Sequence, residues 1–148
     1  IRGMIDRLHR HYEAEVARQE ALDPNPVGRR LRAMINTSFP KEPCNEMRVR
    51  VERVAACLIA AVATNPALLE SVRESSKRME EALLDDGTDP IMAMIIHLAT
   101  DGIWMSSLFG VPHPSGELRE KVLNRLREMT TEYPAPPAAA AAESGVNE

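Results

Sequence analysis

Apolar residues recur at steps of three and four along most of the chain, the spacing that places side chains on one face of an α-helix. Segments that contain proline or glycine separate these runs. The pattern predicts six helices, over residues 1–22, 26–39, 45–64, 66–84, 90–109 and 115–129. The expected fold class is therefore all-α, a six-helix domain with orthogonal and bundle packing.

The fifth predicted helix differs from the others, because almost every face of residues 91–109 carries an apolar side chain. Such a helix is expected to be buried on more than one side. Thr88 or Asp89 can cap its first turn, and Pro90 fits its first position. Gly110 marks its end. The boundaries of this helix are the best defined in the chain.

Composition supports a single helical domain. A chain of 148 residues suits one domain of ordinary size. Aromatic residues make up only 3%, and there are 7 glycines and 8 methionines, whereas a β-sandwich or barrel needs more aromatic residues and glycine turns. The net charge of −4 argues against a domain whose main task is to bind nucleic-acid phosphates. We interpret two basic groups as solvated helix faces, namely Arg29, Arg30 and Arg32, and Arg48, Arg50 and Arg53.

The sequence contains none of the common catalytic or phosphate-binding motifs, such as HExxH, GxSxG, GxxxxGK[ST] or GxGxxG. His9 and His11 are two apart on a helix and cannot clamp a metal together, so we expect neither metal nor cofactor. Cys57 lies in an apolar run and is expected to be a buried thiol, which fits a cytoplasmic protein. The longest apolar stretch, residues 54–63, is too short to cross a bilayer.

His97 and Asp101 are the most informative polar residues, because they are four apart on the most apolar helix and can meet on one face. One interpretation is a buried hydrogen bond with a structural role. The other is a polar contact inside an apolar pocket, the usual composition of a small-molecule site. Catalysis would need a nucleophile, and Ser106 lies largely off that face. The methionines likewise suit either core filling or an adaptable pocket.

Small residues also line the fifth helix, at Ala99, Gly102 and Ser106, and they would let another helix approach closely. The sixth helix adds an apolar stripe. Two consecutive helices with surplus apolar surface suggest a two-fold dimer built as a four-helix bundle. Packing within the chain is the competing explanation.

Residues 98–110, LATDGIWMSSLFG, resemble a late helix of TetR-family regulators, in which a DG-hydrophobic-W segment leads to a Gly/Pro break. The final helix that follows, opening Ser115-Gly116-Glu117-Leu118-Arg119, is similar too. Residues 1–16 resemble the family's long linker helix, and residues 26–33 resemble the start of the next helix. The resemblance covers residues 1–131, and the DG-W segment is its most specific part.

The resemblance implies a regulatory domain over residues 1–133, which binds an inducer among its middle helices and dimerises through its last two. Residues 1–22 would be the linker from an N-terminal helix-turn-helix domain that this chain lacks, so DNA contact would need that domain. Residues 134–148 are expected to be a disordered Pro/Ala-rich tail. The whole would be a cytoplasmic bacterial regulator, a repressor in its complete form, without membrane attachment.

We expect a small apolar or amphipathic ligand, with a polar contact from His97 or Asp101. The expected ligand-binding residues are Met34, Leu58, Met79, Leu83, Met94, His97, Asp101 and Trp104. The expected homodimer interface consists of Ala99, Gly102, Ile103, Ser106, Leu118, Val122 and Leu126.

Two other functions are compatible with the sequence. A helical protein–protein interaction module would have a filled core and no ligand cavity. A small helical enzyme would use His97 and Asp101 together with a third reactive group or a metal. The sequence supplies no such group, so we expect no catalytic activity.

Overall fold

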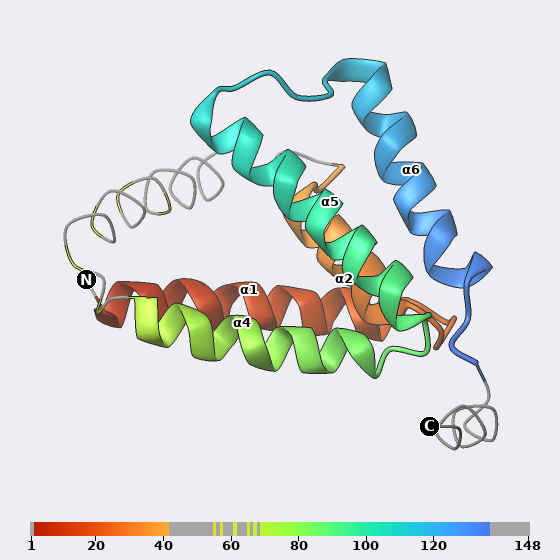
Figure 1. Ribbon diagram of the computed structural model, residues 1–148, viewed down its shortest axis with the longest axis horizontal. Helices are drawn as coiled ribbons and strands as arrows, with labels where there is room; N and C mark the ends of the chain where they lie inside the picture. The colour runs from red at the N-terminus through yellow and green to blue at the C-terminus, as the bar shows by residue number, and fades with distance from the viewer. Residues whose placement is uncertain are drawn as a thin grey trace, which may run out of the picture.

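The computed structural model describes residues 2–41, 55, 57, 61, 65, 67 and 69–136. This part of the chain contains five helices and no strand (Figure 1). They are α1 (Arg2–Leu22), α2 (Arg29–Ser38), α4 (Leu69–Leu84), α5 (Pro90–Phe109) and α6 (Gly116–Glu132). The all-α prediction is confirmed. Most of the helix predicted over residues 45–64 lies outside the described residues, although Ala55, Cys57 and Ala61 are helical.

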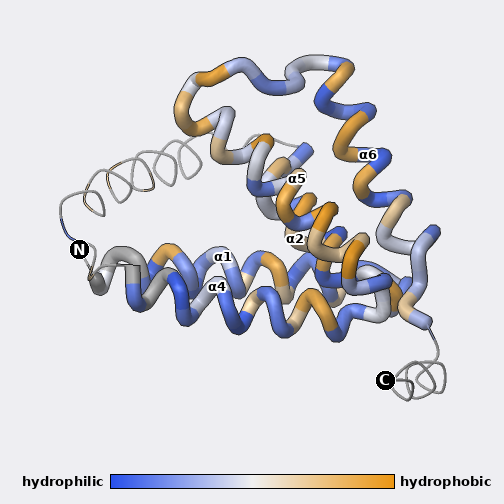
Figure 2. The backbone as a smooth tube through the Cα atoms, viewed as in Figure 1, coloured by the Kyte–Doolittle hydropathy of each residue, from blue (hydrophilic) through white to orange (hydrophobic). Residues whose placement is uncertain are grey.

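Helix α2 is central, since it packs against α1, α4, α5 and α6. Helices α1 and α4 lie side by side, while α5 and α6 cross above them in the view of Figure 1. The core forms where these layers meet, and Figure 2 shows apolar residues, in orange, on both α2 and α5. Its most deeply buried large residues are Val16, Leu31, Met34, Ile35, Leu83, Ile96 and Leu123. The apolar stripe predicted for the second helix therefore faces the core.

The ends of α5 follow the sequence signals. The Asp89 side chain caps the helix by accepting hydrogen bonds from the backbone N–H groups of Ile91 (3.1 Å) and Met92 (3.0 Å). Pro90 occupies the first turn, where its missing N–H costs nothing. Gly110 ends the helix in the left-handed conformation. Ser115 occupies the cap position of α6, but its side chain makes no capping hydrogen bond.

The N-terminus of α2 is capped by a residue that is distant in the sequence. The two carboxylate oxygens of Asp86 accept hydrogen bonds from the backbone N–H groups of Arg30 and Leu31, each at 3.0 Å. The carbonyl of Asp86 also accepts from the N–H of Gly28 at 2.8 Å. The sequence marks Asp86 only as part of the turn that ends α4. The structure shows that this turn holds the start of α2.

Arg32 joins the loop between α1 and α2 to the end of α6. Its Nε donates to Asp23 Oδ2 at 2.7 Å, and its Nη1 donates to Thr130 Oγ1 at 2.7 Å. Further hydrogen bonds run to the carbonyls of Val27 and Asn25. Only 13% of the Arg32 side chain is exposed, and 20% of Arg30. The expectation that these two arginines lie on solvated faces is therefore wrong, because carboxylates and carbonyls from other segments surround them.

The turn after α4 is tied to the end of α6. Thr88 and Thr130 are fully buried, and the Thr88 hydroxyl donates to the Thr130 carbonyl at 2.8 Å. Beyond α6, the N–H of Ala135 donates to the Gly87 carbonyl at 2.8 Å. The chain thus stays attached past residue 134, where the expected tail begins. Residues 137–148 lie outside the described part.

Two expectations about burial are wrong. Cys57 is exposed, because Ala55, two positions earlier on the helix, takes the buried side. Helix α5 buries a single stripe, formed by Ala93, Ile96, Thr100 and Ile103. Its outer apolar residues stay in contact with solvent, since none of the described helices covers them.

Among the described helices, α5 alone is long and apolar enough to cross a membrane. It packs against α2, α4 and α6, and it carries Asp101 in its middle. A core helix of a globular domain passes the same test of length and composition. We therefore interpret α5 as a core helix.

The contact between Gly28 and Thr130 can be tested with a matched pair of variants. Both Gly28 (φ 68°) and Gly110 (φ 64°) are left-handed, but a Cβ on Gly28 would lie 2.5 Å from Thr130 Cβ, whereas a Cβ on Gly110 meets nothing within 4 Å. Gly110→Ala should lower the free energy of unfolding by about 1 kcal/mol through backbone strain. Gly28→Ala should lower it by about 3 kcal/mol, because a clash is added. Urea unfolding of both variants measures the difference, and equal losses would contradict the contact.

Candidate ligand pocket

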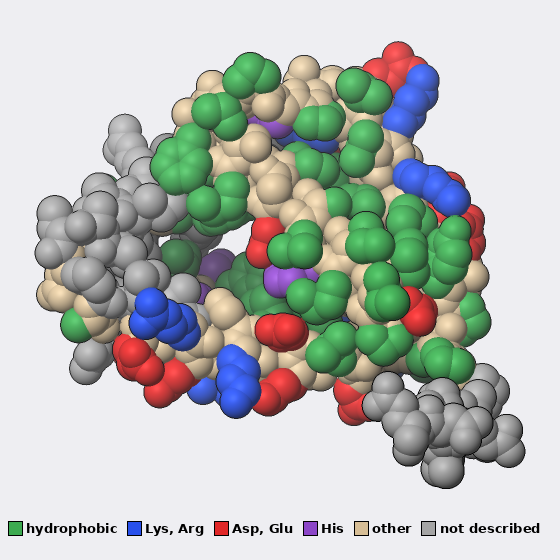
Figure 3. Space-filling view, viewed as in Figure 1, with side chains coloured by type: hydrophobic (Ala, Val, Ile, Leu, Met, Phe, Trp, Pro, Cys, Tyr) green, Lys and Arg blue, Asp and Glu red, His purple; other side chains and the backbone are tan. Residues whose placement is uncertain are grey.

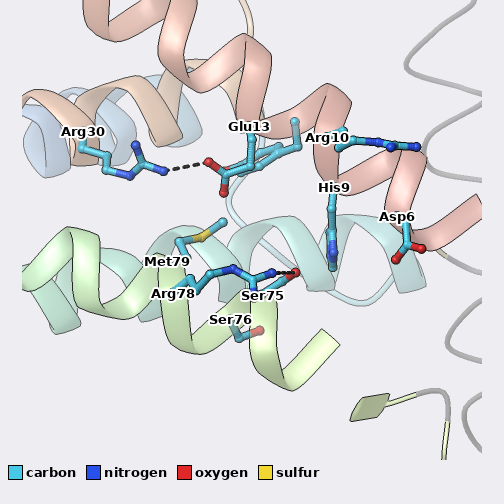
Figure 4. A pocket seen from close by; sticks show the side chains of 10 residues that line it. Asp6, His9, Arg10, Glu13, Arg30, Ser75, Ser76, Arg78 and Met79 are labelled. Carbon is cyan, nitrogen blue, oxygen red and sulfur yellow. Dashed lines mark hydrogen bonds and ion pairs between the residues drawn. The ribbon is translucent and has the colours of Figure 1, made fainter. Parts of the chain in front are cut away.

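A pocket of about 500 Å³ lies between α1 and α4 (Figure 4). It is lined by Asp6, His9, Arg10, Tyr12, Glu13, Arg30, Ser75, Ser76, Arg78 and Met79. Its volume is within the range of small-molecule sites. Asp6, His9 and Glu13 follow one another at intervals of three and four, so they share one face of α1.

Charged and hydroxyl groups dominate the lining. Arg30 donates to Glu13 at 2.8 Å and to Glu20 at 3.1 Å, so its charge is matched. Arg78 donates to the Ser75 hydroxyl at 3.1 Å. Figure 4 shows the His9 side chain pointing from α1 toward α4, where Arg78 and Ser75 lie. The pocket is therefore more polar than the sequence led us to expect.

Tyr12 connects this pocket to α2 and α5. Its hydroxyl lies 3.4 Å from Ser38 Oγ on α2. Burial raises the pKa of Tyr12 from 10.0 to about 12, the Ser38 hydrogen bond lowers it, and the Asp101 carboxylate raises it further. Asp101 on α5 is thus close enough for its charge to reach the phenol.

His97 and Asp101 form the pair predicted from their spacing. His97 Nε2 lies 3.6 Å from Asp101 Oδ2. The His97 side chain is 16% exposed, whereas Asp101 is 56% exposed at the rim. Burial raises the pKa of the Asp101 carboxyl, and the His97 charge opposes this shift. No hydrogen-bond partner for the buried His97 Nδ1 lies within the described residues.

The structure places the expected ligand-binding residues in several surroundings. Met34 and Leu83 belong to the filled core, and Met79 and Trp104 pack against it. Met94 is half-buried. Leu58 lies outside the described residues. Met79 is the member of the expected set that lines the α1–α4 pocket.

The other pocket-lining residues were missed because they belong to the polar sides of amphipathic helices. A polar side looks the same in the sequence whether it faces solvent or a concave surface. Only the packing of α1 beside α4 makes the distinction. Among the described residues, no group of three or more His, Cys, Asp or Glu side chains could hold a metal ion.

A second, apolar groove of about 330 Å³ lies between α5, α6 and the segment that joins them. It brings together five expected dimer residues with three residues of the connecting segment. These are Ala99, Gly102, Ile103, Ser106 and Val122, with Pro112, His113 and Pro114. Leu118 is exposed on α6, whereas Leu126 is buried in the core of its own chain.

The link between Tyr12 and Asp101 predicts a titration. The fold favours the neutral phenol, so Tyr12 contributes stability that is present below pH 10.0 and is lost as the pH rises toward about 12. Asp101→Asn should lower the pKa of Tyr12, because it removes a negative charge. Ultraviolet titration, with Tyr12→Phe to identify the signal, measures this pKa. Asp85→Asn serves as the control, and an unchanged Tyr12 pKa in Asp101→Asn would contradict the link.

The comparisons with known proteins agree with this architecture. A family described as the tetracyclin repressor-like C-terminal domain matches residues 28–131, well over half of the chain. The match includes α2, α4, α5 and α6. No curated protein and no solved structure gave a match. Regulatory domains of this kind are generally non-enzymatic. The chain therefore belongs to the TetR family, as a TetR-like C-terminal domain.

Proposed function

We propose that this chain is the ligand-sensing and dimerisation domain of a TetR-like bacterial transcriptional regulator, a repressor in its complete form. The observation that carries the proposal is the α1–α4 pocket. One of its walls is α1, the helix that resembles the family's linker to the DNA-binding domain. The opposite wall belongs to the matched family domain. A ligand between them would act directly on the connection to that domain.

The mechanism is a shift between two arrangements of α1. A ligand that contacts both walls stabilises whichever separation of α1 and α4 fits it best, and it can shift the equilibrium only by its difference in affinity for the two arrangements. In a dimer, a change in α1 alters the distance between the two DNA-binding heads. The heads then no longer match the spacing of their half-sites.

We further propose that the chain dimerises through α5 and α6. The outer face of α5 carries Ile91, Ile95, Leu98, Met105 and Phe109, all exposed. Together with Gly102, these residues recur at steps of four and three along α5, so they share one face of the helix. Hydrophobic side chains gather over α5 in Figure 3. A contiguous apolar surface of this kind is typical of an interface, and it adjoins the groove against α6.

The dimer proposal predicts a specific response to charge on α5. Leu98 is 63% exposed, so Leu98→Lys should leave the single chain folded but raise the monomer fraction. Leu84→Lys, at an exposed apolar position on α4, is the control and should leave the dimer intact. Gly102→Leu should also raise the monomer fraction, because a larger side chain keeps the partner's helix from approaching closely. A Cβ at this position meets nothing within 4 Å in the single chain, so the fold itself should tolerate the change. Analytical ultracentrifugation measures the outcome. Wild-type protein that is monomeric would contradict the proposal and favour a module that binds a different protein.

The sensing proposal predicts that filling the pocket abolishes ligand response. Ser75→Trp places a bulky side chain in the pocket, whereas Lys77→Trp, on the same helix but outside the lining, does not. Compounds that raise the melting temperature of the wild type by about 5 °C should do so for Lys77→Trp but not for Ser75→Trp. Thermal unfolding against a library of small carboxylates, amines, alcohols and phosphates measures this. A library without a single stabilising compound, or an equal response in Ser75→Trp, would contradict the proposal.

A further inference from the structure

The charges that line the α1–α4 pocket are unevenly matched. Arg30 is neutralised by Glu13 and Glu20. Arg10 and Arg78, from the two opposing walls, form no ion pair with a carboxylate within the described part of the chain. The carboxylates among the described lining residues are Asp6 and Glu13, and Glu13 is already paired with Arg30. Three arginines against two carboxylates leave the described lining residues with one excess positive charge, although the chain as a whole has a net charge of −4.

The donors in the pocket come from both walls. Arg78 and the Ser75 hydroxyl lie on α4, and Figure 4 shows His9 pointing toward them from α1. Arg10 extends along α1 beside His9. A guanidinium presents several N–H groups in a fixed plane and binds carboxylate or phosphate oxygens strongly. Guanidinium, imidazole and hydroxyl groups together match an anionic oxygen group better than a cation.

The lining also contains a smaller apolar part. Met79 and Tyr12 are both half-buried and pack against the hydrophobic core. Their side chains provide apolar surface next to the charged groups. A ligand that uses the whole pocket would therefore have one anionic end and one short apolar end.

We propose that the α1–α4 pocket binds a small amphipathic anion, whose carboxylate or phosphate group is held between Arg78 on α4 and Arg10 and His9 on α1. The proposal rests on the sensing function and specifies its ligand class. It places the polar recognition on α1 and α4 rather than on the His97–Asp101 pair. Because the anion is held from both walls, its binding draws α1 toward α4.

Four probes of equal chain length test the proposal on the wild-type chain: octanoate, octyl phosphate, octylamine and octanol. Binding is followed by titration calorimetry at low ionic strength, with inorganic phosphate as a probe without an apolar end. Octanoate or octyl phosphate should bind at least about tenfold more tightly than octylamine or octanol. The tighter of the two anions identifies the headgroup as carboxylate or phosphate. Inorganic phosphate should bind more weakly than octyl phosphate.

Variants that each remove one charge separate anion recognition from a structural role. Loss of a positive charge should weaken anion binding, and loss of a negative charge should strengthen it. Arg78→Gln should weaken anion binding about tenfold or more, through loss of a charged hydrogen bond. Asp6→Asn should strengthen it about threefold, because a repelling charge is removed. Arg73→Gln, an exposed arginine on α4 outside the lining, should leave it unchanged. A general loss of folding could not produce this pattern.

Equal binding of octylamine, an unchanged affinity in Arg78→Gln, or weaker binding in Asp6→Asn would overturn the anion proposal. Library compounds that stabilise the wild type but not Ser75→Trp bind in the pocket. If these compounds prove to be cations or neutral molecules, the anion proposal fails while the sensing function stands. If neither the anions nor any library compound binds, both fail.

Discussion

The backbone N–H groups that open α2 lie half-buried at the centre of the fold, and the residues that precede the helix offer them no side-chain cap. An unpaired buried N–H group costs about 1–3 kcal/mol, so a partner must come from elsewhere. Asp86 supplies it from 55 residues further along the chain. Burial raises the pKa of this carboxyl, while the N–H groups of Arg30 and Leu31 and the nearby arginines lower it. Both the charge and the hydrogen bonds of Asp86 are therefore tied to the position of α2.

The other connections follow from this one. Because Asp86 ends the turn after α4, its contact with α2 fixes where α4 lies relative to α1. Thr88, two residues later, meets Thr130 and so fixes the end of α6. Arg32, one turn into α2, holds Thr130 and Asp23 at once. The loop after α1, the turn after α4 and the end of α6 thus form a single junction, and the α1–α4 pocket lies away from it along the two helices.

The sequence predicted local structure well where local chemistry determines it. Apolar periodicity, the Asp89 cap, Pro90 and Gly110 gave the boundaries of α5, and the stripe of α2 gave its buried face. The pairing of His97 with Asp101 followed from helical spacing alone. The total of six helices stays a prediction, as does the helix predicted over residues 45–64.

Long-range contacts could not be predicted in this way. Nothing in the sequence distinguishes Asp86, which caps a distant helix, from Asp85, which is exposed. The pocket was missed for a related reason: its lining is polar, and a search for apolar residues around a polar pair leads to the core instead. The many apolar residues of α5 did indicate that the helix has more apolar surface than one packing face can bury. Which of its faces stays exposed follows only from the packing of the helices.

The ion pair between Arg32 and Asp23 has a mechanical consequence. It ties Asp23, which directly follows the C-terminal end of α1, to α2 and so to the junction. Under the proposed mechanism, α1 would therefore pivot about this end. With 21 residues it is a rigid rod about 30 Å long, and the pocket lies around and beyond its midpoint as seen from the pivot. A small opening or closing at the pocket would then be enlarged at the Arg2 end, with the junction as the fulcrum of the proposed movement.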